Sequence, residues 1–331
     1  MKNEIAAFAR FLSENDRYII LTHENPDGDA LGSSCALMNF LRENGKTADF
    51  FLPEKVPARY QNFMPGEGII NDAPPDLFSK YSFCLCVDIP RPEKIGLGGI
   101  FRKENIGIPV ISIDHHPDNA FKGEQDILVP SSAAAAEVVF NIALAFPGNP
   151  PISPETATLM MLGIVTDTNS FRFHNTNTDT LDAAARLLAL KADYFGIMGS
   201  VFFSKPVKML RLESDIILNQ MHVDCDGKFA WAYLSEELLA KYGVELRDIE
   251  GLIDVLRSLE GTEIVALFYR KNSGVKFSLR SKNTRYSVGK IARCFNGGGH
   301  ELAAGGFIDG VDISAAEKII LSQVKELLSE K

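Results

Sequence analysis

Short apolar runs alternate with longer helical patterns in the first half of the chain. The apolar runs are rich in β-branched and aromatic residues and are bounded by turn-forming residues, which is typical of buried strands. They cover residues 18–22, 48–52, 83–87 and 110–113. Helical periodicity covers residues 31–44, 134–146, 155–165 and 178–190. Strands that alternate with helices predict an α/β fold with a mainly parallel, doubly wound sheet covered on both faces.

The second half of the chain predicts a smaller α/β domain. Residues 206–222 have the pattern of one helix with Pro206 at its start, and we interpret it, with the stretch before it, as a connector. Strands are expected at 228–234, 263–270 and 275–280, and helices at 247–259, 286–295 and 314–329. A turn at Lys271–Gly274 joins the last two strands as a hairpin. The predicted parts are residues 1–190, a helical connector over 191–222, and residues 223–331.

The overall composition is that of a globular protein of about two domains. Of the 331 residues, 46% are hydrophobic and 23% are charged, which excludes a disordered chain. No apolar run approaches the roughly 20 residues that a membrane span needs. The first residues carry Lys2, Glu4 and Arg10 in an amphipathic pattern, so no secretory signal is expected. Five scattered cysteines, an odd number without paired spacing, favour a reducing cytoplasmic location.

Charge is distributed unevenly along the chain. Residues 1–190 hold 15 basic and 24 acidic residues, so they carry the whole net charge of −9, and residues 191–331 hold 19 of each. Within the second part, residues 264–300 contain eight basic residues and no acidic one. An acidic first part that also carries most of the histidines indicates a hard cation, and the basic segment indicates an anionic ligand.

Carboxylates and histidines follow four apolar segments of the first half, and we interpret each position as the end of a strand. The residues are His23, Asp27 and Asp29, then Asp88, then Asp114, His115 and His116, and finally Asp167. Taken singly, most of these positions are also explained by an ordinary turn or a helix cap. Two adjacent histidines after an acid are harder to explain by packing. Because parallel sheets bind ligands at the carboxyl ends of their strands, we expect all four segments to meet at one edge.

The residue types in this set indicate a metal site. The candidate ligands are His23, Asp27, Asp29, Asp88, His115 and Asp167. Carboxylates with a minority of imidazoles suit Mn²⁺ or Mg²⁺, with Fe²⁺ or Co²⁺ as alternatives, and no thiolate contributes. Six ligands are too many for one ion that keeps an open position. They suit two divalent cations about 3.5–4 Å apart that share one carboxylate, the arrangement used for in-line phosphoryl displacement.

The basic segment contains a candidate anion site. Three glycines at 297–299 allow backbone amides to approach an anion closely, and His300 adds a side-chain donor. Arg280 can hold a phosphate through two parallel hydrogen bonds. A flexible glycine turn and a solvated basic face are the alternative interpretations. The predicted substrate-binding residues are therefore Arg280, Gly298, Gly299 and His300.

Six ordered motifs resemble those of a known family. The segments HENPDGDALGS, VDIP, DHH and GIVTDT are similar, in this order, to the four motifs of the DHH phosphoesterases. VKFSLRSK and KIARCFNGGGHELAAGGF resemble the DHH-associated nucleotide-binding domain. That second domain favours the branch of nanoRNase/pAp phosphatases. Family II pyrophosphatases carry a different C-terminal domain, and the long exonucleases have extra domains.

The resemblance implies a role for each candidate. One ion is bound by His23 and Asp27, the other by Asp29, His115 and Asp167, and Asp88 bridges the two. Asp114 supports a histidine in its correct tautomer, and His116 contacts the scissile phosphate or assists the leaving oxygen. Asn169 stands where close relatives often have glycine after the TDT motif.

The expected function is that of a two-metal phosphohydrolase acting on very short RNA and on 3′-phosphoadenosine 5′-phosphate. Water activated between the ions attacks phosphorus, and the C-terminal domain holds the terminal phosphate. Expected partners are short single-stranded RNA or small phosphorylated nucleotides, with no membrane, and a homodimer is left open. One alternative is a phosphodiesterase for cyclic or linear signalling dinucleotides that uses the same metal site. A non-catalytic module binding single-stranded RNA is a second alternative, but it has no use for six metal ligands.

Overall fold

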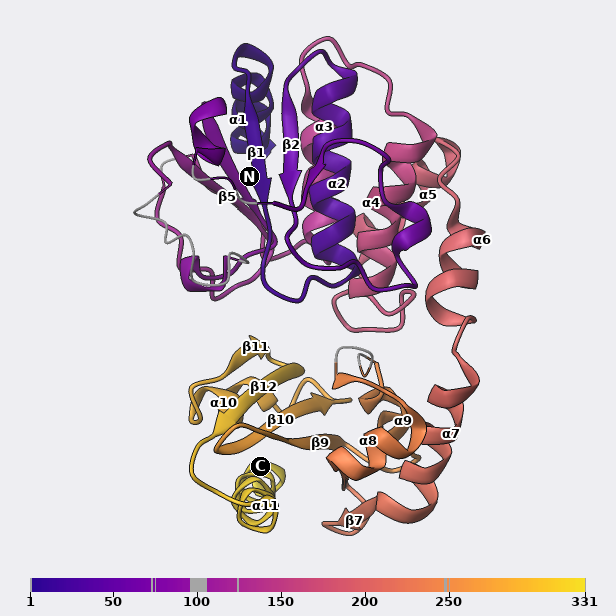
Figure 1. The fold of residues 1–331 in the computed structure, drawn as a ribbon. Coiled ribbons are helices and arrows are strands. Elements are labelled where there is room, and N and C mark those ends of the chain that lie inside the picture. Colours follow the sequence, from indigo (N-terminus) through magenta and orange to yellow (C-terminus); the bar gives the residue numbers. More distant parts are fainter. Residues whose placement is uncertain are drawn as a thin grey trace. The chain divides into compact units, whose positions relative to one another are not determined.

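The computed structural model describes residues 2–72, 74, 76–95, 106–123, 125–246, 249 and 251–330. The chain forms two compact units, Met1–Ser204 and Lys205–Lys331, each built around its own sheet (Figure 1). The boundary between the units lies inside the segment 191–222 that we interpret as a connector. Both units are α/β structures, and helical segments lie directly before and after the boundary, at 194–202 and 207–220.

The first unit contains a six-stranded parallel sheet with the order β3-β2-β1-β4-β5-β6. Its strands are β1 (Tyr18–Leu21), β2 (Ala48–Phe51), β3 (Ile69–Ile70), β4 (Phe83–Val87), β5 (Val110–Asp114) and β6 (Ile127–Leu128). The predicted parallel sheet is confirmed. The chain moves outward from β1 to one side and then returns to β4 on the other side. The carboxyl ends of β1 and β4 therefore flank the position where such sheets bind their ligands.

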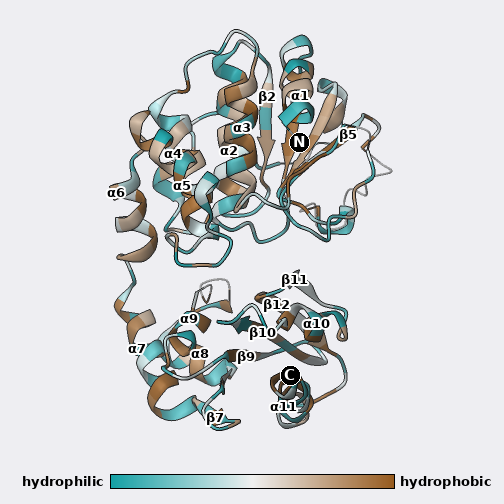
Figure 2. Ribbon diagram, turned by 180° about the vertical axis from the view of Figure 1, so that it is seen from behind, coloured by the Kyte–Doolittle hydropathy of each residue, from teal (hydrophilic) through white to brown (hydrophobic). Residues whose placement is uncertain are grey.

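Both faces of this sheet are buried, as expected for parallel strands. On one face, side chains such as Ile20 and Leu85 pack against helices; these are α1 (Lys2–Glu14), α2 (Gly28–Glu43), α3 (Ala135–Ala145), α4 (Pro154–Asp167) and α5 (Thr178–Ala189). On the other face, Ile19 and Cys84 pack against the 3₁₀ segment η2 (Leu77–Lys80) and neighbouring loops. Figure 2 shows hydrophobic residues along the strands and on the helices beside them.

The single helix predicted at 206–222 is present but ends at Gln220. It consists of α7 (Val207–Asp215) followed directly by the π-helical turn η6 (Ile216–Gln220), and it is preceded by α6 (Tyr194–Ile197) and another π-helical turn, η5 (Met198–Phe202). His222 lies outside the helix and begins strand β7 (His222–Asp224), where its ring stacks on Trp231 at 5.3 Å between centroids. Pairing of β7 with β8 replaces the last helical turn that the periodicity predicts.

The second unit contains a six-stranded mixed sheet with the order β11-β12-β10-β9-β8-β7. Its further strands are β8 (Phe229–Leu234), β9 (Ile264–Lys271), β10 (Gly274–Ser281), β11 (Gly298–His300) and β12 (Ala303–Ile308). The predicted hairpin is confirmed as the antiparallel pair β9–β10. The glycine run, for which a flexible turn is the alternative interpretation, is partly a strand, because Gly298 and Gly299 pair with Gly305 and Ala304.

Helices cover both faces of the second sheet. They are α8 (Glu236–Tyr242), α9 (Ile253–Arg257), α10 (Val288–Arg293) and α11 (Ile313–Ser329). Phe277 on one face packs with α10 and α11, and Leu267 on the other packs with α7, α8 and α9. The helix predicted at 247–259 is shorter, and residues 247, 248 and 250 lie outside the described residues. Within the described part of the chain, every helix is too short or too polar to cross a membrane.

Candidate metal centre

The loop after β1 brings three candidate ligands to the start of α2. His23 follows the strand, and Asp27 caps α2 by accepting hydrogen bonds from the amides of Asp29 and Ala30, both at 3.0 Å. Gly28 has no room for a side chain, because a Cβ there would lie 2.4 Å from Thr166 Cγ2. The first turn of α2 is thus in close contact with the end of α4. This contact explains how Asp167 reaches the same place.

Asp29 is buried and is held by a helix N-terminus. Its two carboxylate oxygens accept hydrogen bonds from the amides of Ala135 and Ala136 at the start of α3, at 2.6 and 2.9 Å. Burial, together with the charges of Asp167 and Asp27, raises the pKa of Asp29 to about 7, although His115 opposes this shift. A cation bound here would favour the ionised carboxylate.

Asp88 lies directly after β4 in a conformation that is unusual for a side-chain-bearing residue. Its φ is 60°, in the left-handed region. The carboxylate is buried, and Oδ1 has no hydrogen-bond partner among the described residues. Burial and the charge of Asp29 raise the pKa of Asp88 well above its usual range. Backbone strain and an unsatisfied buried oxygen at the same residue are typical of a functional position.

Asp114, the last residue of β5, organises the two histidines that follow it. Its Oδ1 accepts hydrogen bonds from the backbone amides of His115 and His116 and lies 2.8 Å from His116 Nδ1. Its Oδ2 accepts a hydrogen bond from Asn119 Nδ2 at 2.5 Å. Burial would raise the pKa of Asp114, but the hydrogen bond and charge of His116 lower it.

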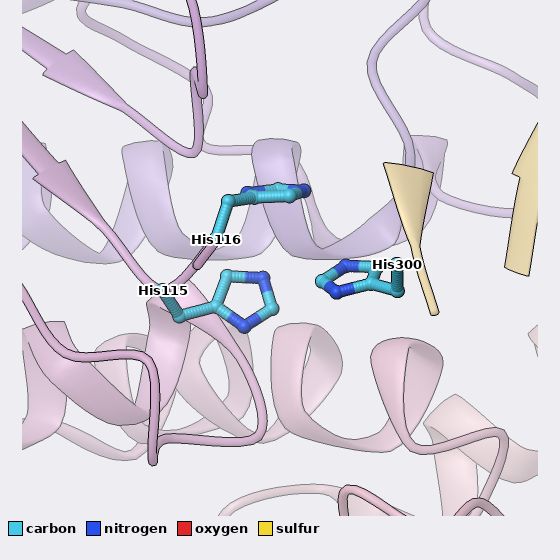
Figure 3. Close-up of side chains that lie close together, drawn as sticks. All are labelled: His115, His116 and His300. Carbon is cyan, nitrogen blue, oxygen red and sulfur yellow. The ribbon is translucent and has the colours of Figure 1, made fainter. Parts of the chain in front are cut away.

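The imidazole of His115 presents Nε2 to three carboxylates. Nδ1 lies 3.3 Å from the carbonyl oxygen of Ser132, so Nδ1 carries a hydrogen and Nε2 is the nitrogen that would bind a cation. Nε2 lies 3.8 Å from Asp29 Oδ2, 3.6 Å from Asp88 Oδ1 and 3.8 Å from Asp167 Oδ2. The neighbouring rings of His115 and His116, 4.7 Å apart between centroids, are shown in Figure 3. Burial would lower the pKa of His115, but Asp88, Asp167 and Asp29 raise it.

Asp167 is the last residue of helix α4, so its interpretation as a strand end is wrong. An apolar run cannot by itself distinguish a buried helix from a buried strand. After Asp167 the chain turns through Asn169, Ser170 and Phe171, all with left-handed φ of 47°, 57° and 61°. Asparagine tolerates this conformation and glycine adopts it freely, which explains why either residue fits at 169.

The six predicted metal ligands form two neighbouring groups. His23, Asp27 and Asp88 form one group and Asp29, His115 and Asp167 the other, with ligand atoms in each group within 4.8 Å of one another. Asp88 faces both groups, because Oδ2 lies 3.8 Å from His23 Nε2 and Oδ1 lies 3.6 Å from His115 Nε2. Burial, with repulsion from the neighbouring carboxylates as a further cause, raises the pKa of Asp29 and of Asp88. The donor set and the unsatisfied Asp88 oxygen fit divalent cations.

The predicted anion-site residues of the second unit lie on β10 and β11, the two strands that flank β12. Arg280 on β10 and His300 on β11 both pair with Ala303 of β12, so they lie at the same level of the sheet. Residues directly opposite in antiparallel strands direct their side chains to the same face. Gly299 has a φ of 126°, and a Cβ there would lie 2.5 Å from the carbonyl oxygen of Ala303. Glycine is therefore required for β11 to pair with β12.

Several basic residues of the acid-free segment are paired with acids from outside it. Arg293 lies 3.0 Å from Glu301, and Lys290 lies 4.0 Å from Glu330. The segment is therefore less uniformly positive in the folded unit than in the sequence.

Two asparagines near the metal ligands have no signal in the sequence analysis. Asn119 holds Asp114, as described above, and also donates to the carbonyl oxygen of Ile89 at 3.2 Å. Asn175 donates to Asp167 and to the carbonyl oxygen of Ala133. Both lie in loops without periodic pattern, where only the tertiary contacts reveal their role.

Comparison with known families assigns both halves of the chain. Residues 17–164 match the N-terminal domain of the DHH family, and residues 226–330 match the DHHA1 domain. The chain is 31% identical over 314 residues to "Bifunctional oligoribonuclease and PAP phosphatase NrnA" of Thermus thermophilus, covering 94% of this chain and 90% of that protein. A protein of the same name from Bacillus subtilis is 25% identical over 309 residues, 93% of each chain.

Solved structures show the same fold. An exopolyphosphatase-related protein from Bacteroides fragilis superimposes with a TM-score of 0.85 at 25% identity, over 100% of this chain and 98% of that one. RecJ of Thermus thermophilus, crystallised with Mn²⁺, has a TM-score of 0.55 at 14% identity, over 98% of this chain and 55% of RecJ. The motif order, the two matched domains and the full-length relatives agree. The chain belongs to the DHH family of metal-dependent phosphoesterases and, within it, to the NrnA type.

Proposed function

We propose that the protein hydrolyses very short RNA oligonucleotides to mononucleotides and removes the 3′-phosphate of 3′-phosphoadenosine 5′-phosphate to give AMP. The observation that carries this proposal is the pair of ligand groups on either side of Asp88. The names of the relatives from Thermus thermophilus and Bacillus subtilis supply the substrate classes. Both substrates present a phosphate ester for in-line displacement at a two-metal site.

In this proposal, one ion would be held by His23 and Asp27 and the other by Asp29, His115 and Asp167, and Asp88 would serve both. When bound, two such cations neutralise the phosphate oxygens and lower the pKa of attacking water. Mn²⁺ is the first choice, with Mg²⁺ or Co²⁺ as alternatives, because carboxylates outnumber imidazoles and no thiolate is present.

His116 is the proposed contact to the scissile phosphate or to the leaving oxygen. The hydrogen bond of Nδ1 with Asp114 fixes the ring, so Nε2 is the atom that remains for the substrate. The side chain of His116 is 17% exposed, whereas that of His115 is 4% exposed. Of the two neighbouring histidines, His116 is therefore the one that a substrate can reach.

Substrate holding is assigned to the second unit. Arg280 and His300, with the amides of Gly298 and Gly299, bind the terminal phosphate of the nucleotide. Their common level on β10 and β11 supports this assignment. A cytoplasmic location is part of the proposal and is supported by the five cysteines, all of which are free thiols.

A substrate panel tests the proposal. Purified protein is incubated, with Mn²⁺ or with EDTA, with labelled RNAs of two to five nucleotides, with 3′-phosphoadenosine 5′-phosphate and with cyclic and linear signalling dinucleotides. We expect metal-dependent release of mononucleotides and of AMP. Strong preference for the signalling dinucleotides would support the alternative phosphodiesterase. Binding of RNA without turnover in Mn²⁺ would contradict an enzymatic function.

A further inference from the structure

We propose that Asn175 is a positioning residue that connects the supports of Asp29, His115 and Asp167 and thereby sets the metal affinity of this group. The inference rests on the proposed function, because it takes these three side chains as ligands of one ion. Asn175 itself is not a ligand. It acts through the atoms to which it donates hydrogen bonds.

The amide of Asn175 makes contacts on two sides. Nδ2 lies 2.9 Å from the carbonyl oxygen of Ala133, 3.2 Å from that of Asp167 and 3.3 Å from Asp167 Oδ2. All three atoms are acceptors, so the amide must present its NH₂ group to them. The reverse orientation would place Oδ1 against three oxygens. One side chain thus bridges the end of α4 and the segment that leads into α3.

The segment reached through Ala133 supports the other two ligands. The carbonyl oxygen of Ser132 lies 3.3 Å from Nδ1 of His115 and so determines which nitrogen of that ring faces the carboxylates. Later in the same segment, the backbone amides of Ala135 and Ala136 donate hydrogen bonds to the two carboxylate oxygens of Asp29. A displacement of this segment therefore moves two ligands together, and Asn175 connects it to the third.

The side-chain amide of Asn175 donates a hydrogen bond to Oδ2 of Asp167. This oxygen is the one that lies 3.8 Å from Nε2 of His115. The side chain of Asp167 is 23% exposed, whereas those of Asp29 and His115 are 2% and 4% exposed. Packing restrains Asp167 least among the three, so an oriented donor has the largest effect there. Outer partners of this kind typically change metal affinity by 10–100-fold.

Asn177 provides a matched control. Its Nδ2 donates to the carbonyl oxygen of Ser131 at 3.0 Å, so it contacts the same segment one position before Ser132. Asn177 also caps α5. Within the described part of the chain, the side chain of Asn177 makes its hydrogen bonds to residues other than Asp167. A substitution at 177 therefore loosens the segment without removing the connection to the ligand.

The test is Mn²⁺ binding to metal-free, full-length protein by calorimetry, for wild type, Asn175→Ala, Asn175→Ser, Asn177→Ala and Asp29→Asn. We expect two ions in wild type, and in Asn175→Ala a 10–100-fold weaker affinity for the ion that Asp29→Asn also loses. The other ion should keep its affinity within about threefold. Asn175→Ser, which retains one short donor, should show a smaller loss and serves if the alanine variant does not fold. Asn177→Ala should lower the thermal stability of the metal-free protein but retain both affinities.

Unchanged Mn²⁺ affinities in both Asn175 variants would overturn the inference and leave the proposed function intact. Equal losses in Asn177→Ala and Asn175→Ala would also overturn it, because a loosened segment would then be sufficient. Wild-type protein that binds no Mn²⁺ would instead overturn the proposed metal site itself. The three results are distinct in the same set of titrations.

Discussion

The Nδ1 atom of His116 lies 2.8 Å from Oδ1 of Asp114, and the same oxygen accepts a hydrogen bond from the backbone amide of His116. The carboxylate therefore fixes both the ring and the peptide of one residue. This geometry gives Asp114 a role that does not require contact with a metal or a substrate.

Asp114→Asn should lower kcat by about 10–100-fold while bound Mn²⁺ is retained, because the amide is a weaker and differently directed partner for the imidazole. His116→Ala should lower kcat at least as much, and the double variant should add little. Steady-state kinetics on a dinucleotide, with metal content measured in parallel, check this. Fully additive losses would show that Asp114 does not act through His116.

Asp88→Asn should lower turnover by several orders of magnitude, because one side chain faces both ligand groups. Asparagine tolerates the left-handed φ of 60° at this position, so the fold should be retained. Asp118→Asn is a matched control, since Asp118 pairs with Arg91 at 3.4 Å and lies outside both groups. Turnover of Asp88→Asn within tenfold of wild type would exclude a bridging role.

Arg280→Ala and His300→Ala should raise KM for nucleotide substrates and leave metal content unchanged. Hydrolysis of bis-p-nitrophenyl phosphate should change much less, because this small ester has no remote phosphate for the second unit to hold. Lys271→Ala, at the exposed end of β9, is the control for a general loss of positive charge. Equal losses on both types of substrate would contradict the assigned role.

The metal-free protein should become less stable as the pH rises from about 4 to about 7 through the contribution of Asp29. Its folded-state pKa of about 7 lies above the usual value near 3.9, so the folded state binds more protons than the unfolded state in this interval. The raised pKa of Asp88 acts in the same direction over this interval, and that of His115 does so only above its usual value near 6.5. Urea denaturation in EDTA at several pH values measures the slope, and Asp29→Asn should flatten it.

Added Mn²⁺ should reverse this trend, because metal binding requires the ionised carboxylates and releases their protons. Stability in saturating Mn²⁺ should therefore increase between about pH 5 and about pH 7. The prediction for the metal-free protein is contradicted if the wild-type protein in EDTA becomes more stable over the same pH interval while the Asp29→Asn variant does not.

Catalytic efficiency should fall steeply once RNA exceeds about five nucleotides, the limit that the family resemblance implies. The acid-free basic segment covers only residues 264–300, and two of its basic residues, Lys290 and Arg293, are paired with acids. Longer strands require an extended basic groove with stacking aromatic residues. Binding should depend only weakly on salt, since about two or three phosphates are contacted. Degradation of a strand of about 20 nucleotides as fast as a trinucleotide would favour an exonuclease of the long-substrate type.

The parallel sheet and the positions of His23, Asp88 and His115 follow from local pattern, because each residue lies one or two positions after a short apolar strand. Helical periodicity at 155–165 predicts α4, but the short apolar run before Asp167 does not show whether that residue ends a helix or a strand. Strands β11 and β12 give no strand signal, because they are rich in glycine, which is rare in strands except where backbones approach closely. The hydrogen bonds of Asn119 and Asn175 to the site reach residues between 5 and 42 positions away in the sequence, so no periodic pattern marks them.

The close contact of Gly28 with Thr166 has a consequence for the order in which the molecule is completed. The donors around Asp88 are distributed from residue 23 to residue 167, and the last of them arrives only when α4 docks against α2. A growing chain that ends at His116, two residues after β5, contains both histidines of the DHH motif but lacks Asp167. The full set of donors therefore requires the first unit at least as far as the end of α4.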